Sequence, residues 1–168
     1  MSLAQINSLS REEFVRLIGS VFEHSPWITK RTGEKRPFAD LDQLHFHLCQ
    51  TIWNANEAEK IKLIQAHPDL VGRAALAGTL TSESTREQTS AGLNKLSSVE
   101  ISEFQKFNQA YREKFNFPFV ICARLNKKEA ILRGFEKRLQ NSRDEEIKTA
   151  LEEISKIAFL RLQDIVAN

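Results

Sequence analysis

One polar stretch of the chain contains the residues whose types and spacing are best suited to chemistry. It begins near His67, and Ser84, Glu87 and Gln88 follow at positions i, i+3 and i+4. On a helix these last three side chains share one face. A histidine exchanges protons near neutral pH, and a neighbouring carboxylate can fix its tautomer and stabilise its cation. The combination predicts acid–base chemistry that needs only side chains.

The backbone around these residues is strongly restrained. Pro68 disfavours helical conformation at His67, so a helix that precedes the pair must end there. Between Thr81 and Ser90 the sequence has no apolar residue. A short helix here has no hydrophobic stripe with which to dock, and polar neighbours or a ligand must hold it. Two plainer interpretations stay open from the local pattern: a helix-terminal histidine satisfied by a carbonyl group, and an exposed connecting helix.

A short apolar run supplies a second candidate element. Residues 117–123 read FPFVICA, and both Pro118 and the β-branched residues favour extended backbone. If this segment is buried, its N–H and C=O groups need partners from side chains or from a bound molecule. A plain buried connector is the alternative.

An arginine lies in the apolar stripe of the last predicted helix. Arg161 follows Ile154 by seven residues and precedes Ile165 by four, so it points inward with them. A guanidinium keeps its proton in proteins, and a buried one must be paired. We therefore expect a carboxylate of this protein or a polar ligand beside Arg161, unless its side chain reaches solvent along the edge of the stripe.

The other histidines do not form a metal-binding pattern. His45 and His47 are two residues apart on one predicted helix and point to different faces, which argues against a metal shared between them. His24 is equally isolated. We expect no metal site and no cofactor.

Helical spacing of apolar residues predicts the elements that position the candidate groups. Small polar residues that can accept hydrogen bonds from the first backbone N–H groups mark the helix starts, in several cases with Glu three residues later. The fold class expected is all-α, one compact domain over residues 1–168 with about seven to nine helices and one extended segment near 117–123. The predicted helices begin at or after Ser10, Asp40, Asn56, Asp69, Thr81 or Ser82, Ser97, Asn126 and Ser142.

Residues that interrupt helices set the predicted ends. The first long helix is expected from about Arg11 to Glu23, where Ser25-Pro26 breaks it, and the polar segment 27–36 as a loop or a single turn. Gly78 and Gly92 are expected C-terminal stops. A further helix is bracketed by Asn126 and Asn141.

Composition indicates a soluble globular protein. Lys and Arg number 24 against 22 Asp and Glu, with both signs spread along the chain, which argues against nucleic-acid binding. Cys49 and Cys122 belong to no CxxC pair and fit reduced thiols. The sequence has no signal-peptide pattern, no apolar run long enough to span a membrane, and no peroxisomal ending at residues 166–168. We therefore expect a cytoplasmic location.

An ordered series of motifs resembles one enzyme family along almost the whole chain. The motifs are His67-Pro68-Asp69-Leu70, Gly78-Thr79-Leu80-Thr81, Glu83-Ser84, Glu87-Gln88, Phe117-Pro118-Phe119-Val120 and Leu160-Arg161-Leu162. Together they resemble the 2-oxo-4-hydroxy-4-carboxy-5-ureidoimidazoline (OHCU) decarboxylases. The resemblance implies an all-helical fold, commonly a homodimer, and removal of CO2 from a small ureidoimidazoline without a cofactor, the last step from urate to (S)-allantoin.

The resemblance also implies roles for individual residues. It assigns acid–base catalysis to His67 and Glu87, and backbone contacts to the FPFV segment. The residues that it places against the substrate are Pro68, Ser84, Gln88, Phe119, Ile121 and Arg161. Two competing functions remain: a non-catalytic helical interaction module, and a metal-dependent hydrolase that uses the four histidines.

Overall fold

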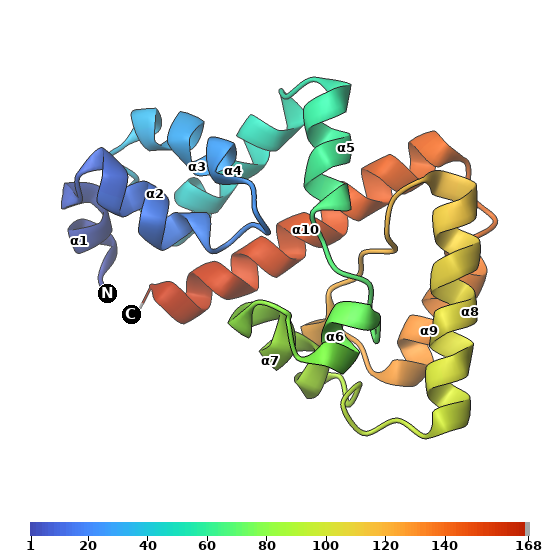
Figure 1. Ribbon diagram of the computed structural model, residues 1–168. Coiled ribbons are helices and arrows are strands. Elements are labelled where there is room, and N and C mark those ends of the chain that lie inside the picture. Colours follow the sequence, from blue (N-terminus) through green and yellow to red (C-terminus); the bar gives the residue numbers. More distant parts are fainter. Residues whose placement is uncertain (167–168) are drawn as a thin grey trace. The chain divides into compact units, whose positions relative to one another are not determined.

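The computed structural model describes residues 1–166, and within them the chain is helical with no β-strand (Figure 1). The all-α prediction is confirmed, although the helices are more finely divided than the seven to nine expected. The described residues form ten α-helices and two 3-10 helices: α1 (Leu3–Ser8), α2 (Arg11–Gly19), α3 (Pro26–Thr32), η1 (Gly33–Lys35), α4 (Leu41–Trp53), α5 (Glu57–Gln65), α6 (Arg73–Ala77), α7 (Ser82–Ser90), α8 (Ser98–Phe115), η2 (Ala123–Leu125), α9 (Lys128–Arg138) and α10 (Arg143–Ile165).

The chain divides into two compact units. Unit 1 contains residues 1–66 and the chain from residue 155 onward, and unit 2 contains residues 67–154. Helix α10 therefore contributes its first half to unit 2 and its second half to unit 1. Ala167 and Asn168, which belong to the expected non-peroxisomal ending, lie outside the described residues.

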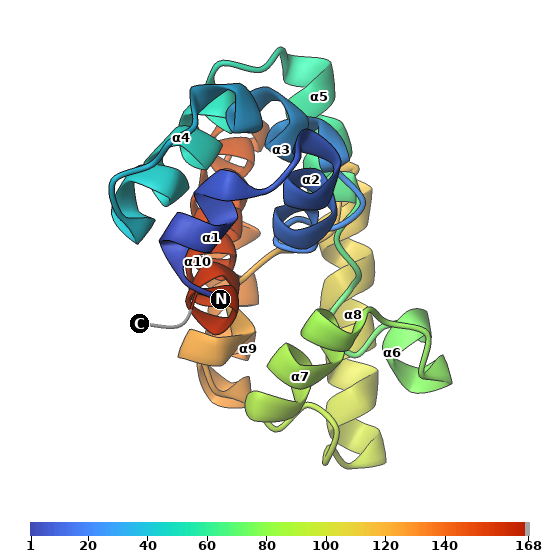
Figure 2. The same ribbon diagram turned by 90° about the vertical axis from the view of Figure 1, so that its left-hand side faces the viewer.

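Unit 1 is built from successive short helices. α2 packs against α3, and α3 packs against both α4 and η1, as Figure 2 shows from the side. On α4, Leu44, Leu48 and Ile52 recur at helical spacing and are all at most 1% exposed, so one face of this helix is buried in the core of unit 1.

Unit 2 has an aromatic core on α8 and α9. Tyr111 and Phe135 are fully buried, and their rings lie 6.4 Å apart. Phe119 from the extended segment stacks on Phe135 at a centroid distance of 3.8 Å and meets Tyr111 edge-on at 5.3 Å. The predicted extended run is present over residues 117–122 and is buried, but it is one residue shorter than expected because Ala123 begins η2.

Most predicted helix starts are confirmed in atomic detail. The Ser10 and Asn56 side chains accept hydrogen bonds from the N–H groups of Glu13 and Glu59, and both glutamates return a bond to the cap residue. The Asp40, Thr81 and Ser97 side chains each accept a hydrogen bond from the backbone N–H three residues later, and so cap α4, α7 and α8. Local hydrogen bonding thus determines where these helices begin.

Two predicted boundaries at the start of the chain are wrong. The first long helix ends at Gly19 instead of Glu23, because residues 21–24 turn away and Glu23 is buried at 3% exposure. Residues 26–32 form a two-turn helix, α3, instead of the loop or single turn that was expected. Pro26 occupies its first turn, where a missing N–H costs nothing, and the buried side chains of Ile28 and Thr32 fix it in the core.

The helix expected between Asn126 and Asn141 is present as α9, but neither asparagine caps it. α9 starts after Lys127 and ends at Arg138. Instead of capping, the Asn126 amide donates to the Cys122 carbonyl at 2.9 Å. Asn141 donates to a carboxylate oxygen of Glu146 at 2.9 Å. Both amides are used for contacts with other segments.

No helix within residues 1–166 is both long enough and apolar enough to cross a membrane. Over the same range no three His, Cys, Asp or Glu side chains gather into a group that could hold a metal ion.

Candidate active site

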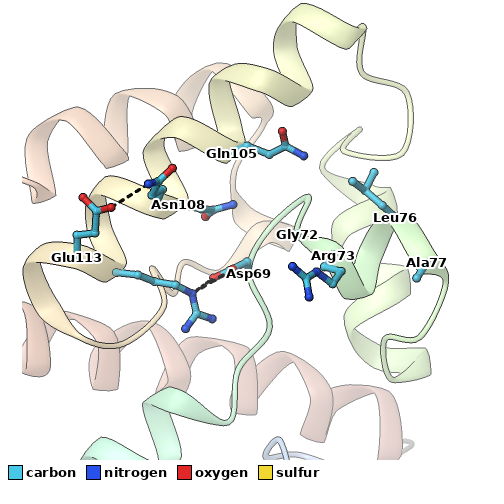
Figure 3. A pocket seen from close by; sticks show the side chains of 10 residues that line it. Asp69, Gly72, Arg73, Leu76, Ala77, Gln105, Asn108 and Glu113 are labelled. Atoms are coloured by element: carbon cyan, nitrogen blue, oxygen red, sulfur yellow. Dashed lines mark hydrogen bonds and ion pairs between the residues drawn. The ribbon is translucent and has the colours of Figure 1, made fainter.

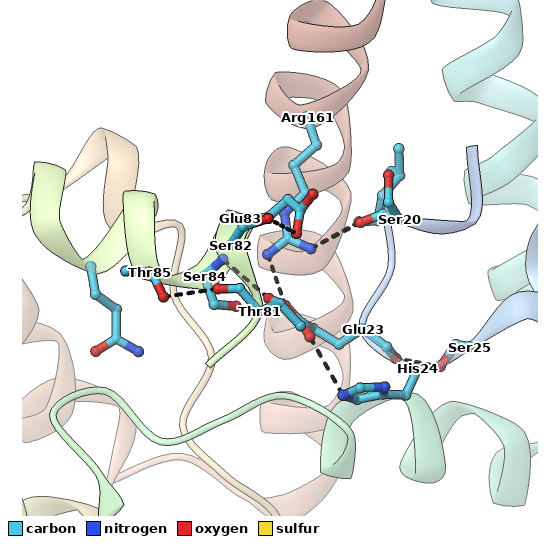
Figure 4. A network of polar contacts seen from close by, with 12 residues as sticks. Ser20, Glu23, His24, Ser25, Thr81, Ser82, Glu83, Ser84, Thr85 and Arg161 are labelled. Atoms are coloured by element: carbon cyan, nitrogen blue, oxygen red, sulfur yellow. Dashed lines mark hydrogen bonds and ion pairs between the residues drawn. The ribbon is translucent and has the colours of Figure 1, made fainter. Parts of the chain in front are cut away.

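The buried face of α7 is entirely polar. Ser84, Glu87 and Gln88 are 5%, 9% and 6% exposed, as their i, i+3, i+4 spacing predicts for one helix face. Thr81 caps the helix by accepting a hydrogen bond from the Ser84 N–H at 3.2 Å, and Figure 4 draws this end of α7. The interpretation of α7 as an exposed connecting helix is therefore wrong.

Gln88 attaches α7 to the segment that follows His67-Pro68. Its side-chain oxygen accepts a hydrogen bond from the Val71 N–H at 3.0 Å, and its amide nitrogen donates to the Asp69 carbonyl at 3.4 Å. From the other side, the Asn108 amide donates to the Leu70 carbonyl at 2.8 Å. Polar contacts thus replace the hydrophobic stripe that α7 lacks.

Val71 adopts a conformation that β-branched residues rarely take. Its φ is +52°, in the left-handed region, where a Cβ branch is strained. The bond from its N–H to Gln88 and the bond from Asn108 to Leu70 hold this turn in place. Strained turns of this type persist only where their surroundings determine them, and they cluster at functional sites.

His67 lies at the end of α5, as Pro68 predicts. α5 ends at Gln65, Ala66 is its cap residue, and His67 is 6% exposed. Pro68 itself is half-buried. An imidazole so enclosed and held by backbone sterics is well suited to accept and return a proton at one fixed place.

The third element of the site is the extended segment. Phe119 and Ile121 are 1% and 8% exposed, and α7 packs against η2, which follows them directly. Burial is the largest cause that raises the pKa of the Cys122 thiol, and the negative charges of Glu153 and Glu87 raise it further. Glu87 therefore lies close enough to the segment for its charge to act on Cys122.

The eighth predicted site residue, Arg161, belongs to unit 1 and is buried there at 4% exposure. Its Nη2 donates to Glu23 Oε1 at 3.0 Å, and its Nη1 lies 3.4 Å from the carbonyl oxygens of Ser20 and Val21 (Figure 4). The expectation of an inward guanidinium paired with a carboxylate is confirmed. The alternative, a side chain that reaches solvent, is wrong.

The eight predicted site residues are thus divided between the two units. Seven of them are in unit 2 and are carried by three connected segments: the α5 exit, α7 and the extended run. Arg161, in unit 1, comes from α10.

Sequence reasoning missed a buried network in unit 2. Glu146 is completely buried and accepts hydrogen bonds from Tyr111, Arg138 and Asn141. Glu146 lies in the first turn of α10, where acidic residues ordinarily only favour the helix dipole, so nothing marks it as interior. The detectable signal was Tyr111, the single tyrosine, whose hydroxyl on an apolar helix face requires a partner.

Two hollows lie beside these elements in unit 2. One of about 710 Å3 is lined by α6 and α8, with Arg73, Asn108 and the Asp69–Arg112 ion pair around it (Figure 3). None of the eight predicted site residues lines it, and most of its wall is exposed surface. The other, about 320 Å3, includes Gln88. The smaller hollow thus reaches the buried polar face of α7 through Gln88, whereas the larger one does not.

Comparison with known proteins agrees with the motif series. A family model described as OHCU decarboxylase matches residues 7–163. The 2-oxo-4-hydroxy-4-carboxy-5-ureidoimidazoline decarboxylase of Amia calva is 43% identical over 166 residues, which cover 99% of this chain and 95% of that protein. The protein of the same name from Halalkalicoccus jeotgali is 37% identical over 98% of this chain and 92% of its own length.

Structural comparison gives the same fold. The crystal structure of an (S)-allantoin synthase superposes with a TM-score of 0.79 at 24% identity over 99% of this chain, which spans about half of that protein (54%). At this identity the likeness shows the fold alone. On the family model and the curated relatives, the chain belongs to the OHCU decarboxylase family.

Proposed function

We propose that this protein decarboxylates 2-oxo-4-hydroxy-4-carboxy-5-ureidoimidazoline to (S)-allantoin, the last step of urate degradation, without a cofactor. One observation carries the proposal: in a chain of this family, His67, Ser84, Glu87 and Gln88 are all buried although none is apolar. Burial of four polar side chains is costly unless they are hydrogen-bonded. A cluster of enclosed polar side chains from two segments supports a role in binding and proton transfer.

The substrate itself supplies the electron sink. Its carboxylate is on a hydroxylated ring carbon beside a C=N bond. When the bond to the carboxylate breaks, CO2 leaves and the electron pair moves through the ring to the nitrogen of the C=N bond, which takes up a proton. The hydroxyl group then loses its proton and becomes a carbonyl, while the adjacent ring carbon takes up a proton. No pyridoxal, thiamin or metal is needed to hold the charge. The protein has to control protons and orientation.

His67 and Glu87 form the proposed acid–base pair. His67 takes or shares the hydroxyl proton, and Glu87 fixes the imidazole tautomer and stabilises its cation. The product is a single enantiomer if the proton donor reaches only one face of the planar intermediate. General acid–base groups of this type contribute about 10²- to 10⁴-fold to rate.

The remaining residues are proposed to bind the substrate. Ser84 and Gln88 offer hydrogen-bonding groups, and the Gln88 amide can make more bonds than the two that hold Val71 and Asp69. Phe119, Ile121 and Pro68 supply apolar wall and backbone contacts. Each of these assignments rests on motif match and burial.

Arg161 is proposed to bind a ring or ureido oxygen. Charge grows there in the transition state, whereas a bond to the carboxylate would stabilise the ground state and slow the loss of CO2. A complex with a substrate analogue checks this. A guanidinium paired with the carboxylate position would contradict it.

A coupled assay tests the proposed function. Urate oxidase and hydroxyisourate hydrolase generate the labile substrate, and ultraviolet absorbance and circular dichroism follow its conversion. We expect (S)-allantoin to form faster than the spontaneous background with the wild-type protein. His67→Asn and Glu87→Gln should each lower kcat about 10²-fold or more. Equal rates with and without the protein would refute the function and favour the non-catalytic interaction module.

His47→Asn is the matched control. It makes the same chemical change on α4, where the His47 ring packs against Phe38 at 5.7 Å. This histidine is outside the proposed site, and its variant should retain wild-type kcat. A similar loss in both histidine variants would show that the assay reports stability instead of chemistry.

We further propose that the protein acts as a cytoplasmic homodimer whose 168 residues form one functional domain, with no nucleic-acid or membrane partner. The free thiols of Cys49 and Cys122 support a reducing compartment. Sedimentation equilibrium tests the dimer, and a single species at the monomer mass of 19.3 kDa would contradict it.

A further inference from the structure

The buried network around Glu146 holds the extended segment as well as the core. The Glu146 carboxylate, 0% exposed, accepts from the Tyr111 hydroxyl and from Arg138 Nε at 2.7 Å on one oxygen, and from Asn141 on the other at 2.9 Å. Burial and then the bond to Glu146 raise the pKa of Tyr111, so its hydroxyl stays a donor. Three donors from two helices and a turn fix this carboxylate.

Arg138 connects the network to the segment. Its Nη1 donates to the Val120 carbonyl at 2.6 Å, and its guanidinium carbon lies 4.3 Å from the Phe119 ring centroid. From the same helix, α9, the Phe135 ring stacks on the Phe119 ring at a centroid distance of 3.8 Å. A Cβ on Gly134 would lie 3.4 Å from Phe119 and 3.5 Å from Ile121, so α9 also approaches the segment closely.

The hydrogen bond from Arg138 to the Val120 carbonyl also sets the direction of the N–H group that follows it. The Val120–Ile121 peptide unit is planar and trans, so its carbonyl and its N–H point in opposite directions. A guanidinium held by Glu146 fixes the carbonyl on one side. It thereby fixes the Ile121 N–H on the other side, pointing away from Arg138.

We propose that Arg138, held by Glu146 and Tyr111, is a positioning residue that aims the Ile121 N–H at an oxygen of the bound ureidoimidazoline. This step rests on the proposed function, in which Phe119 and Ile121 contact the substrate. The ligand group it selects is a hydrogen-bond acceptor, a carbonyl or carboxylate oxygen. Arginine suits the task because its rigid fork serves Glu146 and Val120 together, whereas a lysine has a single nitrogen.

The variants must separate positioning from folding. Arg138→Met alone would leave the Glu146 charge buried without its partner. The double variant Arg138→Met/Glu146→Gln removes both charges and keeps an amide for Tyr111 and Asn141. Arg138→Lys keeps the positive charge but loses the planar guanidinium that bonds Glu146 and the Val120 carbonyl at the same time. Ile131→Val, two turns earlier on α9 and fully buried, is the control for a core change on the same helix that leaves the Arg138–Val120 hydrogen bond in place.

Two measurements are made on each variant: steady-state kinetics with the enantiomer ratio of the product, and hydrogen exchange of the backbone amides in residues 117–123. We expect the double variant to lose about 10- to 100-fold in kcat/KM, chiefly through KM, with less pure (S)-allantoin and faster exchange in the segment. Arg138→Lys should be intermediate, and Ile131→Val should match the wild type.

Wild-type KM, enantiomer ratio and exchange in a folded double variant would overturn the positioning role, as would an equal KM change in Ile131→Val. If the double variant does not fold, Arg138→Lys decides by the same criteria. A wild-type protein that does not accelerate allantoin formation refutes the proposed function, and with it the substrate contact. Exchange in residues 117–123 then still reports whether Arg138 holds the segment.

Discussion

The side-chain oxygen of Gln88 accepts a hydrogen bond from the backbone N–H of Val71 at 3.0 Å, across seventeen residues of sequence. Val71 is 1% exposed and has a left-handed backbone. The bond therefore satisfies a donor that water does not reach and holds the turn that follows His67-Pro68.

Gln88→Ala should lower the free energy of unfolding by about 1–3 kcal/mol, because it leaves the buried Val71 N–H without its acceptor. Urea denaturation followed by circular dichroism measures the change. Gln50→Ala makes the same truncation on an exposed position of α4 and should stay within about 0.5 kcal/mol of wild type. Equal losses in the two variants would show that helix content, and not the bond to Val71, sets the effect.

Breaking the buried ion pair of unit 1 should be costly. Glu23→Gln removes the negative partner of Arg161, whose side chain is 4% exposed against 2% for Glu23. We expect a loss of about 3 kcal/mol in unfolding free energy, since a buried charge is left uncompensated. Thermal unfolding of Glu34→Gln provides the control, because Glu34 pairs with Arg11 on the open surface and should contribute less than about 1 kcal/mol.

Gly72→Ala should distort the turn beside His67. A Cβ at Gly72 would lie 2.6 Å from the Asp69 Cβ, and Asp69 is itself held by Arg112 at 2.9 Å. We expect a loss of about 1–3 kcal/mol together with lower decarboxylase activity. At Gly19 the nearest atom to a new Cβ is 3.7 Å away, so Gly19→Ala should be neutral or stabilising. A wild-type melting temperature for Gly72→Ala would show that Asp69 can move aside.

Acid should weaken the helix starts. Bonds from Ser10 and Ser142 hold the pKa values of Glu13 and Glu145 below the ordinary 4.5. Because the pKa is lower in the folded state than in the unfolded state, this stabilisation is complete when the pH is above the unfolded-state pKa. It is lost as the pH falls through the folded-state pKa. Glu13→Gln/Glu145→Gln keeps the capping geometry without the titration.

The melting temperature of that double variant should therefore fall less than that of wild type between pH 5 and about pH 3. Glu103→Gln, an exposed position in the body of α8, should follow the wild-type curve. Parallel curves for the double variant and the wild type would contradict the capping origin of the effect.

The helix starts were predictable because they depend on residues three apart, such as Ser10 with Glu13 and Asn56 with Glu59. The buried face of α7 was predictable from spacing alone. The end of α2 was not, because Glu23 leaves the helix to pair with Arg161, 138 residues away in sequence. The Glu146 network was missed because its donors come from three separate elements: Asn141 and Arg138 precede Glu146 by 5 and 8 residues, and Tyr111 precedes it by 35. Contacts between elements, and not local spacing, decide these two features.

The polar packing of α7 also bears on how the site responds to heat. Local unfolding of a helix that buries Ser84, Glu87 and Gln88 exposes little apolar surface, so it carries a small heat-capacity change. Unfolding of the aromatic core of unit 2, in contrast, exposes much apolar surface and carries a large heat-capacity change. Helix α7, which carries proposed site residues, can therefore open locally with little change in heat capacity, and we expect warming to inactivate the enzyme before the whole protein unfolds.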